Sequence, residues 1–554
     1  LHCNTERIGL MKDETLNANT LGNAAHHDLQ FRIPRQPIVR KGIVFKEVDD
    51  GIKLLGAPTD KLFKGQFAKN QLMRLVNLCD GTRTHEQIAD ALELPAEAIF
   101  RAISLMWTSG AIEEGDNNHL KNHLLPETIT LFSRLGDSTG INESWLDAVD
   151  KLSNLRILIV GDNLFADSIL LELSKLIDNV DKNMETPTHV IVSTLDSRAE
   201  DRELDEILWE SKIPVIYTDL TKTTLTIGPY VDPTFTPCSQ CARTYQNNRT
   251  NNGYFRDINF AAGLVARNLI SLFTQVTNSY LPMDIVTINL ETLEHSAHTP
   301  STRPGCPICG NATGPVSANA PTAAIYEATV TIPPRAYMDL KGHQLHYKPS
   351  NLKLQHDFRT WKNGETLKLP KVGLETLQAA IEVPKNNINE TLTLTSLALI
   401  LKISCGLQEP DSSEKKLRRW TAAGGNIGSV TGYVIITDPS IAPPGAYVYQ
   451  EHNHSLVKLN DDTSAAPSPH SQATLVLSGN VNKVAKKYYA FALRITLQDS
   501  GCSLTSAQLV AENLHIYTKI ETDWNDLALS ETCSIPINSE IIAAVMSIGD
   551  YNAL

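Results

Sequence analysis

Four of the nine cysteines stand at the spacing of metal ligands. Cys238 and Cys241 form one C-x-x-C pair, and Cys306 and Cys309 form another. Each pair presents two thiolates from a tight turn. Four thiolates complete the tetrahedral shell of a structural zinc ion and leave no position for a water. The spacing therefore predicts a closed, non-catalytic zinc site, with a redox-active dithiol as the alternative interpretation.

The segment that holds these cysteines, residues 145–315, begins with a strand, a turn and a helix. Leu155–Val160 is a nearly continuous apolar strand, and Gly161-Asp162-Asn163 forms the turn. The helix that follows has three apolar residues on one buried face: Leu170, Leu173 and Ile177. Further short buried strands are expected at residues 190–193 and 214–217. This order of elements predicts a Rossmann-type α/β domain.

Together with the cysteine pairs, the segment resembles the ThiF-like domain, the fold of ubiquitin-activating enzymes. Members that adenylate use a glycine-rich turn, because only glycine lets the backbone reach the phosphates. In this chain Gly161 is followed by non-glycine residues: Asn163, Leu164, Phe165 and Ala166. The resemblance therefore implies a domain that binds no ATP. It implies instead a domain that docks a precursor leader peptide and activates a separate YcaO cyclodehydratase.

Residues 38–115 predict a hairpin followed by three short helices. The hairpin covers Ile43–Leu55, where apolar and polar residues alternate around an Asp-Asp-Gly turn. The first helix has a buried stripe from Leu72 to Cys79, the second begins with a Thr84–Gln87 capping box, and the third follows Pro95. This layout is typical of a winged-helix-like unit.

The third helix of that unit carries Glu97 and Arg101 and is otherwise apolar or small, which disfavours reading of DNA. The layout resembles PqqD-like peptide-recognition elements, in which a leader peptide adds as a strand to the wing and packs against the third helix. The resemblance implies a leader-binding groove lined by Lys53, Leu55, Ala98, Arg101, Ala102 and Leu105. A purely structural winged helix is the alternative.

Residues 325–554 follow a linker that bears Pro, Ala and Ser, and they contain three further motifs. These are Arg418–Asn426 (RRWTAAGGN), Pro443–Tyr449 (PPGAYVY) and Lys487–Arg494 (KYYAFALR). In this order they resemble segments of SagB-type dehydrogenases, flavoenzymes of the nitroreductase fold that oxidise azolines to azoles. The resemblance implies an α+β domain that dimerises and binds FMN through Arg418, Arg419, Thr421, Gly424, Gly425, Asn426, Lys385 and Arg494.

The same resemblance assigns Lys487 and Tyr488 as catalytic residues. An azoline must lose a hydride to the flavin and a proton to a base. A lysine or tyrosine can accept that proton only if its pKa is lowered by burial or by a neighbouring cation. The alternative interpretation is a surface lysine of a basic run followed by a core tyrosine.

Three departures from the SagB-type pattern favour a pseudo-dehydrogenase as an alternative. Ile381-Glu382-Val383 stands where the family has an arginine motif, so Glu382 would face the flavin phosphate and only Lys385 supplies a cation there. Ala422 replaces a serine, and the segment 522–529 lacks the glycines of the family.

The composition narrows the class of protein. The 554 residues carry 49 Lys and Arg against 62 Asp and Glu, a net charge of −13, which argues against nucleic acid or anionic membranes as partners. No apolar run reaches the roughly 18 residues of a membrane span, and Leu1–Leu10 is unlike a signal peptide, so we expect a cytoplasmic location.

The sequence thus predicts an α/β multidomain chain with an N-terminal extension over residues 1–37 and the three modules above. The hypothesis is a maturation protein for azole-containing peptides of the thiazole/oxazole-modified microcin class. It would bind a precursor leader, work with a YcaO cyclodehydratase and oxidise azolines with FMN. A non-catalytic leader-binding scaffold is the first alternative. An unrelated NAD(P)H nitroreductase is the second.

Overall fold

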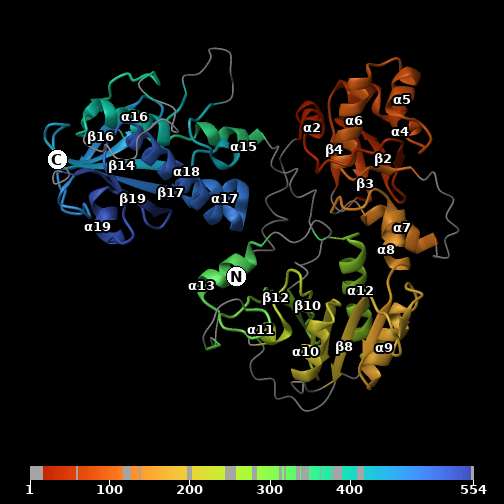
Figure 1. The fold of residues 1–554 in the computed structure, drawn as a ribbon. Coiled ribbons are helices and arrows are strands. Elements are labelled where there is room, and N and C mark those ends of the chain that lie inside the picture. The colour runs from red at the N-terminus through yellow and green to blue at the C-terminus, as the bar shows by residue number, and fades with distance from the viewer. Residues whose placement is uncertain are drawn as a thin grey trace. The chain divides into compact units, whose positions relative to one another are not determined.

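The computed structural model describes residues 16–57, 60–115, 126–136, 139–195, 202–243, 257–277, 284–310, 315–316, 320–331, 337, 349–361, 364–375, 377, 390–408 and 417–550. The chain divides into two compact units, one that ends at Tyr347 and one that begins at Lys348 (Figure 1). The sequence suggested that the last module starts at residue 325. The division between the units lies after that residue, because helix α13 (Thr322–Thr329) belongs to the first unit. Each unit is a mixed α/β structure with a seven-stranded sheet.

The N-terminal part of the first unit packs helices against a small antiparallel sheet. Its strands lie in the order β2-β3-β4, so β3 is central. The predicted hairpin is confirmed as β2 and β3, and the Thr84–Gln87 capping box forms at the start of α5. The bounds are α2 Ala18–Ala25, β1 Pro37–Val39, β2 Val44–Val48, β3 Gly51–Leu55, β4 Lys61–Phe63, α3 Gln66–Asn70, α4 Leu72–Leu78, α5 His85–Leu92, α6 Ala96–Thr108 and β5 Ile112–Glu114.

The rest of the first unit is built on a sheet of order β12-β11-β10-β9-β8-β6-β7, in which β7, β6, β8 and β9 are parallel. Because side chains alternate along a strand, Ile191 faces α8, α9 and α12, whereas Val190 and Val192 face α10. The bounds are α7 Pro126–Leu135, α8 Trp145–Ser153, β6 Ile157–Val160, α9 Leu164–Leu173, β7 Val180–Asp181, β8 His189–Leu195, α10 Arg202–Glu210, β9 Val215–Leu220, β10 Thr224–Val231, α11 Ser239–Arg243, α12 Ile258–Thr274, β11 Ile285–Asn289 and β12 His295–His298.

A buried ion pair ties these two parts of the first unit together. Nη1 of Arg40 lies 3.0 Å from Oε2 of Glu113, and the two side chains are 1% and 2% exposed. Arg40 also donates to the carbonyls of Ile112 (3.2 Å) and Ser133 (2.7 Å). Glu113 accepts from the Ser133 hydroxyl and, at 3.1 Å, from the amide of Trp145. Since Ser133 lies in α7 and Trp145 begins α8, this network attaches both helices to the β1–β5 pair.

The second unit contains a sheet of order β13-β16-β15-β14-β17-β19-β18, with every neighbouring pair antiparallel. Helices α16 and α18 pack on the face that includes Val434 and Leu475, and α19 packs on the face of Tyr433 and Val476. The bounds are α15 Pro349–Lys353, β13 Thr366–Lys368, α16 Leu394–Cys405, β14 Val430–Ile436, β15 Gly445–Gln450, β16 Ser455–Asn460, β17 Ser471–Asn480, α17 Val481–Tyr488, α18 Ala492–Asn513, β18 Thr518–Ile520, α19 Asp526–Thr532 and β19 Glu540–Asp550.

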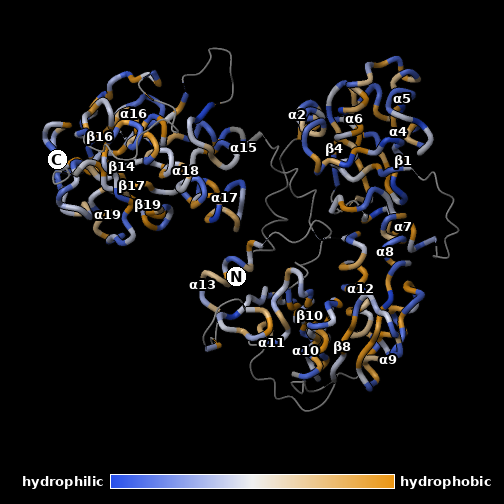
Figure 2. The backbone as a smooth tube through the Cα atoms, viewed as in Figure 1, coloured by the Kyte–Doolittle hydropathy of each residue, from blue (hydrophilic) through white to orange (hydrophobic). Residues whose placement is uncertain are grey.

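Hydrophobic residues concentrate where these layers meet, for example along α6 in the first unit and α16 in the second (Figure 2). Within the described part of the chain, no helix combines the length and apolar character needed to cross a membrane.

The substitution Arg40→Met tests the buried ion pair. It leaves the Glu113 carboxylate buried without its cation, so the free energy of unfolding of the first unit should fall by about 3–5 kcal/mol. Urea unfolding followed by tryptophan fluorescence measures this change. Arg83→Met is the matched control, because Arg83 pairs with Asp80 at the surface, where both side chains are about 40% exposed. It should cost no more than about 1 kcal/mol, and equal effects of the two substitutions would contradict the role of Arg40.

Candidate functional site

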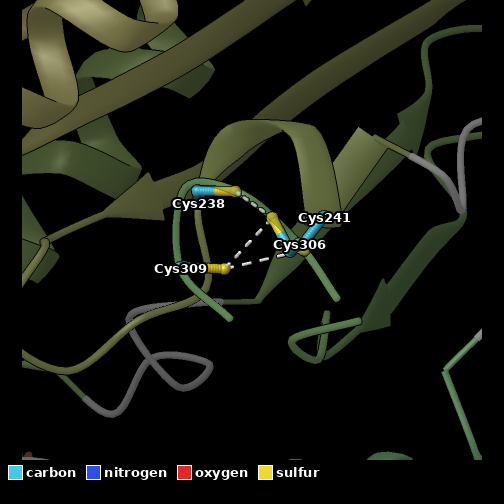
Figure 3. Close-up of side chains that lie close together, drawn as sticks. All are labelled: Cys238, Cys241, Cys306 and Cys309. Carbon is cyan, nitrogen blue, oxygen red and sulfur yellow. Dashed lines mark hydrogen bonds between the residues drawn. The ribbon is translucent and has the colours of Figure 1, made fainter. Parts of the chain in front are cut away.

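The two predicted cysteine pairs meet in the first unit. Cys238 and Cys241 lie at the start of α11, and Cys306 and Cys309 lie in the loop after β12, so that the four side chains point toward one another (Figure 3). The Sγ atoms of Cys238 and Cys306 are 3.7 Å apart, those of Cys241 and Cys309 3.6 Å, and those of Cys306 and Cys309 3.8 Å. All four ligand atoms lie within 4.8 Å of one another.

This cluster has the dimensions of a tetrahedral metal site. Zn–S bonds of about 2.3 Å place neighbouring sulfurs about 3.8 Å apart in a tetrahedron, which matches the spacings between these thiols. A disulfide would require sulfurs only about 2.0 Å apart. Because all four thiols converge within 4.8 Å of one another, they fit a structural zinc ion better than a redox pair.

Within the cluster, the surroundings favour thiolate character at Cys241. The Cys241 sulfur accepts hydrogen bonds from the Cys238 and Cys309 thiols and from the amide of Arg303 (3.3 Å), and these bonds lower the pKa of Cys241. Gly310 donates its amide to the Cys306 carbonyl at 3.0 Å. A Cβ on Gly310 would lie 2.7 Å from that carbonyl oxygen, so the second turn requires a glycine.

Asn163 holds the turn between β6 and α9 in place of a run of glycines. The Asn163 side chain accepts from the amide of Ala166 (2.9 Å) and donates to the carbonyl of Ser193 (3.1 Å), so it caps the helix. Phe165 is fully buried. A Cβ at Gly161 would lie 2.6 Å from the Ser193 carbonyl oxygen, so this glycine serves the close approach of β6 to β8.

The residues predicted to bind a leader lie on β3 and α6. Lys53 and Leu55 belong to the central strand of the small sheet, whose backbone pairs with β2 on one side and β4 on the other. An added strand would therefore have to use an outer edge of β2 or β4. The sequence missed β4 because a three-residue strand carries little periodic signal.

On α6, the predicted residues are already in contact with other parts of the fold. Ala102 is 8% exposed and belongs to the core, and Ala98 and Leu105 are partly buried. Arg101 is covered by α2: its Nη1 donates to Oδ1 of Asn19 at 3.2 Å, and a Cβ on Gly22 would lie 2.5 Å from its Cγ.

In the second unit, the predicted catalytic pair lies against the predicted flavin turn. Lys487 and Tyr488 end α17, and a Cβ on Gly425 would lie 2.5 Å from Nζ of Lys487 and 2.9 Å from the hydroxyl of Tyr488. Gly425 has a φ of +60°. Only a glycine therefore suits both the backbone conformation and the close approach of these two side chains. Nζ of Lys487 also lies 5.1 Å from the centre of the Tyr488 ring.

Asp499, which the sequence did not single out, holds this turn in place. Its carboxylate accepts from the amide of Gly424 at 2.8 Å and from the hydroxyl of Ser429 at 2.5 Å. Burial raises the pKa of Asp499, and these two hydrogen bonds oppose that rise. Asp499 lies on the buried stripe of α18 with Thr496 and Ser503, so its helical position was a signal that could have found it.

The other predicted flavin residues are dispersed around the turn. Arg419 is 7% exposed and pairs with Glu451, which no local pattern could reveal because the two are 32 positions apart. Four more lie nearby: Thr421 donates to the carbonyl of Ile403 at 2.7 Å, Asn426 donates to Gln355 at 2.9 Å, Arg418 is exposed, and Arg494 lies over the ring of Phe491. Lys385 and the preceding Ile381-Glu382-Val383 are outside the described residues.

The cavity beside this turn offers one cationic donor that a phosphate could use, together with the Asp499 carboxylate. Arg419, Thr421, Gly428, Ser429 and Asp499 are among the residues that line one cavity. Among the described residues, Nε of Arg419 is buried with no hydrogen-bond partner, which leaves a cationic donor for a phosphate. The cavity has a volume of about 20 Å³, room for roughly one water, so a flavin ring does not fit inside it.

Comparison with known proteins gives fold similarities only. No protein-family model and no curated protein matches the chain. Among solved structures, a heterocyclase in complex with substrate and cofactor is 17% identical over 50% of this chain and 39% of its own, with a TM-score of 0.38. MccB from E. coli is 12% identical over 50% of this chain and 97% of its own, with a TM-score of 0.40.

A protein from Anabaena variabilis with a nitroreductase assignment is 20% identical over 35% of this chain and 40% of its own, with a TM-score of 0.29. At these TM-scores the similarities neither assign the chain to a family nor transfer an activity to it.

The metal site can be tested by elemental analysis of the purified chain. We expect about one zinc ion per chain, because the four thiols complete one tetrahedral shell. Cys306→Ser should lose the ion, since a neutral hydroxyl is a poor replacement for a thiolate. Cys405→Ser, at a buried cysteine of the second unit, is the control and should retain it. Full zinc content in the Cys306 variant would refute the site.

Proposed function

We propose that this chain matures a ribosomally made peptide that contains azole rings. The first unit would bind the precursor leader and engage a separate YcaO cyclodehydratase. The second unit would oxidise thiazolines and oxazolines to thiazoles and oxazoles with FMN, as a homodimer. The observation that carries this proposal is that Lys487 and Tyr488 both approach Gly425. The turn that contains Gly425 lies beside a cationic donor, Nε of Arg419, that suits a flavin phosphate.

The pKa values of the two candidate catalytic residues are shifted in opposite directions. Burial lowers the pKa of Lys487, so more of its amine is neutral at a given pH and able to accept a proton. Burial and then the negative charge of Asp499 raise the pKa of Tyr488, so its phenol stays protonated and can donate a hydrogen bond. The environment therefore favours Lys487 as the base and Tyr488 as a group that orients the substrate.

The chemistry of aromatisation then divides between cofactor and protein. The Gly424–Asn426 turn and Arg419 would hold FMN, which would supply an acceptor for the hydride from one ring carbon. Nζ of Lys487 accepts the proton that leaves the neighbouring ring carbon. The leader would be held by the first unit, so the second unit needs to bind only the ring and its flanking residues.

The role of Lys487 can be tested by substitution. Lys487→Ala should lower the rate of azole formation by about 10²–10⁴-fold, the usual contribution of a general base, while bound flavin is retained. Lys486→Ala is the matched control, because Lys486 is the neighbouring residue and forms an exposed pair with Asp357. Mass spectrometry of a thiazoline-containing peptide measures conversion through the loss of two hydrogens.

The pH dependence of the wild-type rate provides a second measurement on the same base. The rate should fall as the pH decreases through the pKa of Lys487, because the protonated amine cannot accept a proton. That fall should lie below the pH range of an exposed lysine, since burial lowers this pKa. Equal rates for Lys487→Ala and Lys486→Ala would exclude Lys487 as the base.

A non-catalytic scaffold is the second candidate, and one observation favours it. Glu451 already neutralises Arg419, and Asp499 already occupies the amide of Gly424, so two of the predicted phosphate donors have internal partners. In that case the second unit would be structural, and the chain would only dock the leader and activate the cyclodehydratase.

The absorption spectrum of the purified chain separates the two candidates. With FMN added and the excess removed, the oxidase should retain flavin absorbance at about one equivalent per chain. Arg419→Leu should release that flavin, because it removes the buried cation. A chain that retains no flavin, yet still stimulates a YcaO cyclodehydratase on its precursor, would establish the scaffold.

A further inference from the structure

One arginine connects the two cysteine pairs of the first unit through its main chain. The amide of Arg303 donates to Sγ of Cys241 at 3.3 Å. The carbonyl of Arg303 accepts from the amide of Cys306 at 3.1 Å. Cys241 and Cys306 belong to different pairs, which are distant in the sequence and are brought together by the fold (Figure 3). These two bonds of Arg303 therefore hold the second pair against the first.

The side chain of Arg303 returns to the first pair. Its Nη2 donates to the carbonyl of Gln240 at 3.4 Å, and Gln240 stands between Cys238 and Cys241. Its Nε is buried and, among the described residues, has no hydrogen-bond partner. A buried donor without a partner is rare in native proteins and requires an explanation. Since a guanidinium is always charged, the fold keeps a positive charge beside the turn of the first pair.

The charge of a filled metal site explains why a cation belongs there. A zinc ion carries two positive charges and four thiolates carry four negative ones, so the filled site is an anion. Cys238, Cys241 and Cys306 are each no more than 2% exposed, so water does little to stabilise that anion. Burial of an unbalanced charge costs free energy, and a neighbouring charge of opposite sign offsets part of this cost.

We propose that Arg303 is the positioning residue of the metal site. Its main chain would hold the two cysteine pairs in register, and its guanidinium would balance part of the negative charge of the four thiolates around the ion. The inference rests on the metal site and goes beyond the proposed function, because it involves neither the leader nor the flavin.

The experiment compares two substitutions at Arg303 in the full chain. Arg303→Gln keeps an N–H donor on the side chain and removes the charge, whereas Arg303→Lys keeps the charge and removes the planar fork. Competition with a chromophoric chelator measures the affinity for Zn²⁺. Arg303→Gln should weaken that affinity by about 10–100-fold, the usual effect of losing an outer-shell partner, and Arg303→Lys should weaken it by less than about tenfold.

Arg267→Gln is the matched control for the loss of a cation from the same unit. Arg267 lies on an exposed part of α12, where its Nη1 donates to the hydroxyl of Ser271 at 2.8 Å. This variant should bind Zn²⁺ as tightly as the wild-type chain does.

Co²⁺ bound in place of Zn²⁺ separates an effect of charge from a change of shape. Its visible d–d bands report whether four sulfurs still form a tetrahedron, and its near-ultraviolet band reports the transfer of charge from sulfur to metal. A positive charge beside the thiolates holds their electrons more tightly. Arg303→Gln should therefore move the charge-transfer band to longer wavelength and leave the d–d bands in place. Arg303→Lys should leave both unchanged.

Three results would overturn the inference. The first is a wild-type chain that binds neither Zn²⁺ nor Co²⁺. The second is an Arg303→Gln chain that binds Zn²⁺ as tightly as the wild type. The third is an equal loss of affinity in the Gln and Lys variants with an unmoved charge-transfer band, because shape alone would then account for the loss.

If circular dichroism shows that Arg303→Gln does not fold, Arg303→Lys decides the matter. A folded Lys variant that loses more than about tenfold in Zn²⁺ affinity would contradict a role for the charge. None of these readouts depends on bound flavin or azole formation, so failure of the proposed function would be seen separately.

Discussion

The first unit depends on the buried ion pair between Arg40 and Glu113. Two charges withdrawn from water are stable only when their remaining hydrogen-bonding positions are filled, and here Ser133, Ile112 and the amide of Trp145 fill them. Those partners come from β5, α7 and α8, so satisfying the charges also fixes the β1–β5 pair against these two helices. Helix α6 and the cysteine cluster thereby belong to one compact unit.

In the second unit, the buried charged side chains surround the Gly424–Asn426 turn and do not join two parts of the fold. Arg419, Lys483 and Lys487 lie near the glycine turn, and Glu451 and Asp499 lie among them. The acids stabilise the fold without a ligand, because each accepts hydrogen bonds from a neighbour that would otherwise be unsatisfied. They also compete with any anion for the same donors. Affinity for an anion and stability of the fold are therefore opposed at this site.

Patterns within a few residues of sequence correctly predicted a helix start and the two cysteine pairs. The Thr84–Gln87 capping box forms because each side chain serves the other's backbone amide, and the C-x-x-C pairs meet as their spacing required. What the sequence could not reveal depends on contacts between distant segments. The packing of α2 on Arg101 and the pairing of Arg419 with Glu451 are set by the tertiary fold, as is the central place of β3. The role of Asp499 also depends on the tertiary fold, since its partners Gly424 and Ser429 are 75 and 70 positions away.

The cysteine cluster has one more consequence, which concerns the order in which the chain folds. Cys238 and Cys306 are 68 positions apart, and α12, β11 and β12 lie between them. A metal ion shared by the two pairs would close this stretch into a ring, and the entropy lost in closing a ring grows with its length. The ion can bind tightly only after the sheet edge has formed. Once bound, it would slow the unfolding of that edge, so removal of the metal would shorten the lifetime of the folded chain.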